Sequence, residues 1–205
     1  MNSFGVLFVF ILGCVAGYLG GGSGDVGRTS LYVLYALMFQ VGVSIGCTDN
    51  LHRILRLFRP RMLLLPLATI TGSLLFSALV SFLVTRWSCT ECMAVGSGMG
   101  YYSLSSILIT ELKTASLGTQ VATELGMIAL LANILRELAA VVLAPLFRRL
   151  FGPFGAVGAA GVTSVDVALP ALSKSCGRDI VPIALFHGFL VDLSVPLIVP
   201  FFAAM

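Results

Sequence analysis

The sequence contains few charged residues. Asp, Glu, Lys and Arg make up 10% of its 205 residues, whereas 58% of the residues are hydrophobic. A soluble domain carries about 25% charged residues, because it needs them to cover the surface that faces water. This chain has too few charges to coat a water-facing globule. Its composition therefore excludes an ordinary soluble domain and predicts that lipid surrounds most of its surface.

Basic residues are also scarce, and they are nearly absent from the hydrophobic runs. A nucleic-acid interface needs Lys and Arg interleaved with polar surface residues, and the sequence has no such stretch. We therefore expect no nucleic-acid partner. The arginines gather at the ends of hydrophobic runs, as expected of residues that set membrane topology by remaining in the cytoplasm. The main group is Arg53, Arg56, Arg59 and Arg61.

Cysteine and histidine are too few to form a recognisable metal site. Cys89 and Cys92 are spaced as Cys-x-x-Cys in a short predicted loop, but no second cysteine pair or histidine completes a zinc-binding pattern. We therefore expect neither a metal nor a cofactor. The role of this cysteine pair stays open between coincidence and a redox or metal role.

Long hydrophobic runs account for most of the chain. No Lys or Arg precedes Arg28, so the first run lacks the basic start of a secretory signal and is predicted to be a membrane helix. A membrane-crossing helix needs about 20 predominantly apolar residues. The runs predict an all-α polytopic membrane protein with about five membrane-crossing helices, in a single integral membrane domain over residues 1–205. They cover residues 4–20, 31–47, 62–85, 118–147 and 180–203.

Two further segments, 94–112 and 153–175, are rich in glycine and hydroxyl groups. Closely spaced glycines weaken a continuous helix. We predict broken or re-entrant segments, with breaks within 96–104 and 158–168 that face the protein interior. The polar residues around the breaks, which are candidates for a substrate or proton site, are Tyr101, Tyr102, Ser103, Thr163, Ser164 and Asp166.

The two segments resemble each other when one is shifted by 61 residues. This offset matches Gly100 with Gly161 and Ser103 with Ser164. It indicates a possible internal repeat. Paired glycine- or proline-interrupted segments at matching positions point to the binding site of a transporter.

Four charged residues in the apolar segments need partners or a water-filled cavity, namely Arg136, Glu137, Asp166 and Asp192. Asn133, Arg136 and Glu137 lie three and four residues apart and so share one helix face. An ionised group at the bilayer centre costs about 3 kcal/mol even on lenient insertion scales. Arg136 could pair with Asp166, and Glu137 with a basic residue elsewhere, and the sequence does not choose between these. Asp166 is the strongest functional candidate: it could bind a cationic substrate, carry a coupling proton, or only cap broken backbone.

The remaining candidates each have two interpretations. Asp192 is either a proton relay or a helix–helix hydrogen-bond partner. His187 falls near the membrane edge by residue count, where it is either an interface histidine or a relay. Glu111 either faces headgroup water or has a gating role. Tyr101 and Tyr102 are either walls of the site or interfacial aromatic residues.

Several ordered motifs resemble the LysO-type lysine exporter family. They are Gly-Met-Gly-Tyr-Tyr-Ser-Leu-Ser at 98–105, Leu-Ala-Asn-Ile-Leu-Arg-Glu at 131–137 and Thr-Ser-Val-Asp-Val-Ala-Leu-Pro at 163–170, followed by Pro-Ile-Ala at 182–184 and His-Gly at 187–188. The match runs in order from about residue 31 to 203.

The resemblance implies a transporter in the inner (cytoplasmic) membrane that exports L-lysine in exchange for protons and needs membrane-embedded acidic residues. Asp166 falls on the family's acidic position. Many members are longer and carry extra N-terminal helices with another acidic residue. We therefore expect this shorter form to act with a small membrane partner protein or as a homodimer.

Two other functions remain as alternatives. In a channel or regulatory subunit, the same polar segments would form a static filter. In an intramembrane serine protease, Ser23 of Gly-Gly-Ser-Gly would be the nucleophile and His187 the base. Proton-dependent transport against a gradient would distinguish an exporter from the first alternative, and insensitivity to Ser23→Ala would exclude the second.

Overall fold

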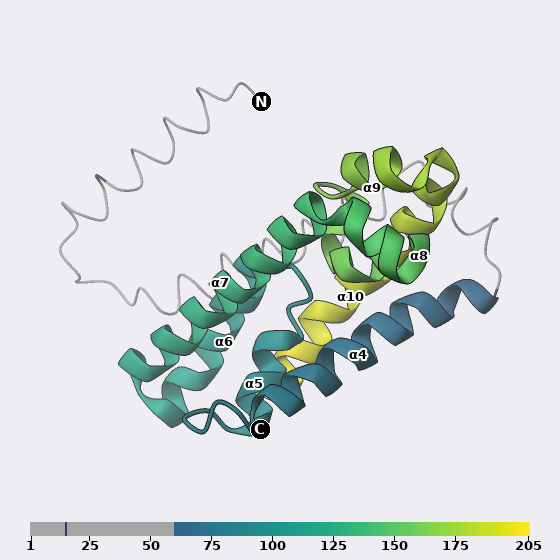
Figure 1. Cartoon of the computed structure of the whole chain (residues 1–205). Coiled ribbons are helices and arrows are strands. Elements are labelled where there is room, and N and C mark those ends of the chain that lie inside the picture. Colours follow the sequence, from purple (N-terminus) through teal and green to yellow (C-terminus); the bar gives the residue numbers. More distant parts are fainter. Residues whose placement is uncertain (1–14, 16–59) are drawn as a thin grey trace. The chain divides into compact units, whose positions relative to one another are not determined.

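The computed structural model describes Val15 and residues 60–205. The chain divides into two compact units, Met1–Gly46 and Cys47–Met205, and the elements named below belong to the second (Figure 1). Several sequence predictions concern residues outside the described part. These are the hydrophobic runs 4–20 and 31–47, the arginines Arg53, Arg56 and Arg59, and Ser23.

Every regular element in residues 60–205 is a helix, in agreement with the predicted all-α class. The α-helices are α4 (Leu64–Val80), α5 (Cys89–Gly96), α6 (Tyr102–Leu117), α7 (Thr119–Val142), α8 (Ala144–Ala160), α9 (Leu169–Cys176) and α10 (Val181–Ala204). Three 3₁₀ turns join them, η1 (Pro60–Leu63), η2 (Gly161–Val165) and η3 (Arg178–Ile180).

Two of the described helical segments are long and apolar enough to cross a membrane, α7 and the stretch Arg178–Ala204 that contains α10. The predicted run 62–85 forms a shorter helix, because α4 has 17 residues and ends at Val80. The predicted run 118–147 is divided between α7 and α8.

Helix α5 begins at a capping box. The Ser88 hydroxyl accepts a hydrogen bond from the Glu91 backbone N–H, and the Glu91 carboxylate accepts one from the Ser88 N–H at 2.7 Å. Cys89 and Cys92 follow this cap, so they lie in the first turns of α5 and not in the loop that we expected. Both thiols are free.

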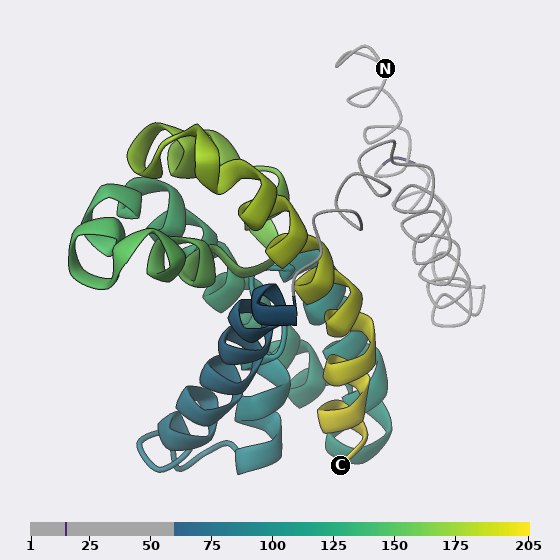
Figure 2. The same ribbon diagram turned by 90° about the vertical axis from the view of Figure 1, so that its right-hand side faces the viewer.

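Helices α6 and α7 form a tightly packed hairpin (Figures 1 and 2). The chain turns at Gly118, whose φ is +79°. At Gly126, an added Cβ would lie 2.0 Å from the Thr110 hydroxyl oxygen, so the two helices approach too closely for any side chain there. Small residues allow this close approach between membrane helices.

Helix α10 extends from the region of α8 and α9 to that of α5 and α6 (Figure 2). Its residues Val191, Val195 and Val199 are fully buried at intervals of four, which places them on one face. A second core lies between α7, α8, α9 and α10, and it consists mainly of small residues such as Ala156, Ala160 and Ala184. Close packing of these helices brings the non-helical segments together.

Two breaks in the helices meet inside the molecule. Residues 97–101 separate α5 from α6, with φ of +46° at Met99 and +101° at Gly100. The second break begins after α8, at Gly161, whose φ is +63°. The Val162 N–H donates a hydrogen bond to the Met99 carbonyl at 3.0 Å. A Cβ on Gly161 would lie 2.2 Å from the same carbonyl oxygen, so the crossing requires glycine.

Candidate functional site

Asn133 of α7 binds the backbone of the first break. Its side-chain oxygen accepts a hydrogen bond from the Gly100 N–H at 2.7 Å. Its amide nitrogen lies within hydrogen-bond distance of the Val95 and Ala129 carbonyls and of the Ser105 hydroxyl. A helix break leaves backbone groups without partners, and burial makes such groups costly. Asn133, which is 3% exposed, supplies those partners.

Arg136, one turn further along α7, binds the backbone of the second break. Its guanidinium donates from Nε to the Ala159 carbonyl at 3.1 Å and from Nη2 to the Gly158 carbonyl at 3.2 Å. Both carbonyls lie in the last turn of α8, where helical partners are missing and the helix dipole is negative. Nη1 donates to the Ser73 hydroxyl at 2.9 Å. One face of α7 therefore stabilises both breaks.

Arg136 does not pair with Asp166, which was one of the candidate pairings that the sequence left open. Among the residues that the structure describes, the one ion pair is between Arg86 and Glu124, on the exposed surface. Arg136 instead has uncharged acceptors, and Glu137 forms no ion pair within residues 60–205. Carbonyls at a helix end replace the carboxylate that we expected, because the break provides acceptors close to the guanidinium.

His187 is completely buried inside the protein. Its Nδ1 lies 3.0 Å from the Ser164 hydroxyl, and its Nε2 lies 2.9 Å from the Thr69 hydroxyl. The Ser164 oxygen is also 2.8 Å from the Gly161 carbonyl, which can take the hydroxyl hydrogen. A neutral His187 with its hydrogen on Nδ1 satisfies these contacts, since Nε2 then accepts from Thr69. The ring connects α4, η2 and α10.

Two carboxylates, from α7 and α10, lie within electrostatic range of a third that follows the second break. Asp166 follows η2, Asp192 lies in α10 and Glu137 in α7. Asp166 interacts electrostatically with the other two and with the Tyr101 hydroxyl, which also interacts with Asp192. We call Asp166, Asp192 and Glu137 the carboxylate cluster. Asp166 is exposed, and its Oδ1 accepts a hydrogen bond from the Val167 N–H at 2.5 Å.

The other sequence-predicted residues divide into two groups. Thr163 is buried in η2, and its hydroxyl donates to the Ala160 carbonyl at 2.9 Å, so it supports the second break. Tyr102 and Ser103 are exposed in the first turn of α6, and Glu111 is partly buried two turns further along. None of these last three has a hydrogen bond or ion pair from its side chain within residues 60–205.

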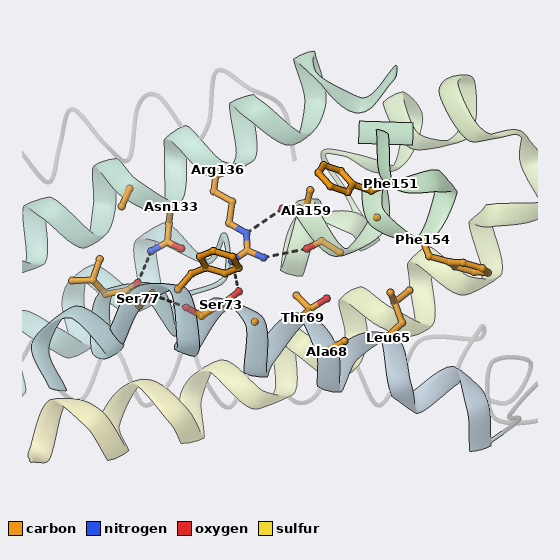
Figure 3. Close-up of a pocket in the computed structure, with 17 residues that line it drawn as sticks. Leu65, Ala68, Thr69, Ser73, Ser77, Asn133, Arg136, Phe151, Phe154 and Ala159 are labelled. Atoms are coloured by element: carbon orange, nitrogen blue, oxygen red, sulfur yellow. Dashed lines mark hydrogen bonds between the residues drawn. The ribbon is translucent and has the colours of Figure 1, made fainter. Parts of the chain in front are cut away.

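A cavity of about 750 Å³ lies on another side of the breaks, between α4, α7, α8 and the end of α5 (Figure 3). Asn133 and Arg136 line it, whereas Glu137 and the rest of the carboxylate cluster do not. The three polar residues of α7 therefore do not form one site as we expected. Glu137 follows Arg136 directly, and consecutive helical residues point about 100° apart.

Sequence reasoning missed the polar face of α4. Thr69, Ser73 and Ser77 line the cavity, and two of them bind residues named above. Their spacing of four residues places them on one helix face, where hydroxyl groups in an otherwise apolar helix gain nothing from lipid. The fourfold spacing of these hydroxyl residues is the sequence pattern from which the polar face could have been predicted.

Comparison with known proteins identifies the family. A model of the family described as "Lysine exporter LysO" matches residues 7–203. The chain is 34% identical over 178 residues to lysine exporter LysO of Escherichia coli K12, and the match covers 86% of this chain and 56% of that protein. It is 30% identical over 176 residues to a candidate lysine exporter of Haemophilus influenzae, with 86% and 85% covered.

The chain thus spans about half the length of the E. coli relative. Both relatives are named as exporters, which are membrane transport proteins and not enzymes. No solved structure matches the chain. The family that its motifs suggested is confirmed, and the chain belongs to the lysine exporter LysO family.

Proposed function

We propose that this protein exports L-lysine across the cytoplasmic membrane, as a multi-pass carrier that exchanges the amino acid for protons. The observation that carries the proposal is that Asp192 and Glu137 lie within electrostatic range of Asp166, which follows the second of two crossed helix breaks. The names of the relatives supply the substrate. Broken helices that cross at the centre of a bundle are the usual setting of binding sites in secondary transporters.

Electrostatics explains how such a cluster can exchange two cations. Negative charges within electrostatic range of one another repel, so a nearby positive charge stabilises them. Either a proton or an ammonium group of lysine can supply that charge. Binding of one therefore weakens binding of the other, which is the requirement for exchange. The Tyr101 hydroxyl also lies within electrostatic range of Asp166 and Asp192.

The breaks supply the moving parts. Asn133 and Arg136 hold the ends of the broken helices through a few hydrogen bonds to backbone N–H and C=O groups. The surrounding helices pack through small residues. Backbone of this kind is tolerated at membrane depth where protein covers it or a cavity adjoins it. Alternating exposure of the cluster would arise from movement of the broken segments against α7 and α10.

Counterflow tests the proposal. Purified protein in liposomes preloaded with unlabelled lysine should accumulate labelled lysine from outside, and arginine or leucine inside should support this less well. The assay is run on this chain alone and with any small membrane protein encoded beside it, which also tests the expected partner or homodimer. Absence of counterflow in both preparations, with folded protein verified, would contradict the proposal. Flux that runs only down the gradient and ignores protons would instead favour a channel.

A further inference from the structure

The cavity in Figure 3 has the size and lining of a small-molecule site. Its volume of about 750 Å³ lies within the range of about 300–1,000 Å³ typical of such sites. Aromatic side chains, including Phe151 and Phe154, form part of an otherwise largely apolar wall. Polar groups are confined to the faces of α4 and α7, where Arg136 and Ser73 lie in contact (Figure 3).

Hydrogen-bond donors exceed acceptors at this polar part of the wall. A guanidinium has five N–H groups, and the three hydrogen bonds of Arg136 leave two of them. Ser73 accepts one of those bonds, and its own hydroxyl hydrogen has no acceptor within residues 60–205. Ser77 differs, because its hydroxyl donates to the Ser73 carbonyl at 2.7 Å.

The positive charge of the Arg136 guanidinium also has no opposite charge paired with it within residues 60–205. All three acceptors of Arg136 are uncharged, and no carboxylate pairs with it in the described part of the chain. The end of a helix supplies the equivalent of about half a negative charge, so α8 offsets only part of the guanidinium charge. A cation removed from water needs a counter-charge, and the spare donors favour one that accepts several hydrogen bonds.

We propose that Arg136 and Ser73 bind the α-carboxylate of the amino acid that the protein transports. This inference rests on the proposed function, and it assigns the anionic end of the substrate to the cavity of Figure 3. A guanidinium presents its N–H groups in a planar fork that matches the two oxygens of a carboxylate. The carboxylate cluster would take the ammonium group at the far end of the lysine side chain. The transported compound would then need both charges.

Equilibrium binding of L-lysine and L-lysinamide to the intact chain in detergent tests this assignment, because an uncharged amide replaces the carboxylate in lysinamide. Wild-type protein should bind lysine at least about tenfold more tightly, the expected effect of hydrogen bonds to a charged group. Ser73→Ala should weaken lysine binding several-fold and leave lysinamide binding unchanged. Arg136→Lys should remove most of the preference. Ser81→Ala, outside the cavity, is the control, and it should change neither affinity, since that hydroxyl donates to the Ala78 carbonyl at 2.6 Å.

The outcomes separate this inference from the proposed function. Equal binding of both compounds by wild-type protein, or equal weakening of both by Ser73→Ala, would overturn the carboxylate assignment and leave lysine export standing. Failure of wild-type protein to bind either compound would overturn both. Ser73→Ala keeps the test decisive even where Arg136→Lys does not fold, because Arg136 keeps both of its backbone hydrogen bonds in that variant.

Discussion

Gly161→Ala should separate the two crossed breaks. An alanine there has two costs. The backbone conformation, with φ of +63° and ψ of −130°, strains a residue with a side chain by about 1–3 kcal/mol. The new Cβ would also lie 2.2 Å from the Met99 carbonyl oxygen, a backbone atom that cannot rotate away. Relief of that contact sacrifices the hydrogen bond from Val162 to Met99, at about 1–3 kcal/mol for the buried groups left unpaired.

Gly118→Ala is the matched control for this prediction. Gly118 has a φ of +79°, but nothing lies within 4 Å of an added Cβ. The Gly118→Ala variant therefore has only the cost of backbone strain. Unfolding in mixed detergent micelles, followed by circular dichroism, should show a loss of about 2–6 kcal/mol for Gly161→Ala and about 1–3 kcal/mol for Gly118→Ala. Equal losses in the two variants would refute a direct contact between the breaks.

Two further substitutions test the roles of the polar residues. Asp166→Asn keeps the shape of the side chain and one hydrogen-bond acceptor but removes the negative charge. Counterflow of lysine should therefore fall at least about tenfold while folding is retained. The control, Glu111→Gln, lies outside the carboxylate cluster and should transport normally. Normal transport by a folded Asp166→Asn protein would reduce Asp166 to a backbone cap. Asn133→Ala leaves the buried Gly100 N–H unpaired, so it should lower the free energy of unfolding in mixed detergent micelles by about 1–3 kcal/mol. An unchanged free energy of unfolding would show that water replaces the amide.

Local patterns in the sequence predicted the helical class and part of the candidate site. The scarcity of charge and the long hydrophobic runs predicted the helical class, because lipid-exposed backbone must satisfy its own hydrogen bonds. The spacing of Asn133 and Arg136 predicted a shared face of α7, which follows from helical geometry alone. Closely spaced glycines drew attention to Gly100 and Gly161, and both have positive φ in the structure.

Long-range partners could not be predicted in this way. Arg136 looked like half of an ion pair, because the carbonyls released at the end of α8 become visible only once the helix is known to break there. The partner of His187 could not be predicted either, since Thr69 lies 118 residues earlier in the chain. Ser73 carried no individual signal, and only its fourfold spacing with Thr69 and Ser77 marks the polar face of α4.

The central claim is that lysine and protons compete for the carboxylate cluster, and proton movement measures this directly. Liposomes containing the protein and a trapped pH-sensitive dye, with the membrane potential clamped, are given a lysine gradient without any initial pH gradient. If lysine is exchanged for protons, lysine moving in one direction should drive protons in the other and change the internal pH. Asp166→Asn should abolish this pH change while vesicle integrity is unchanged. Lysine movement at the normal rate without any change of internal pH would contradict it.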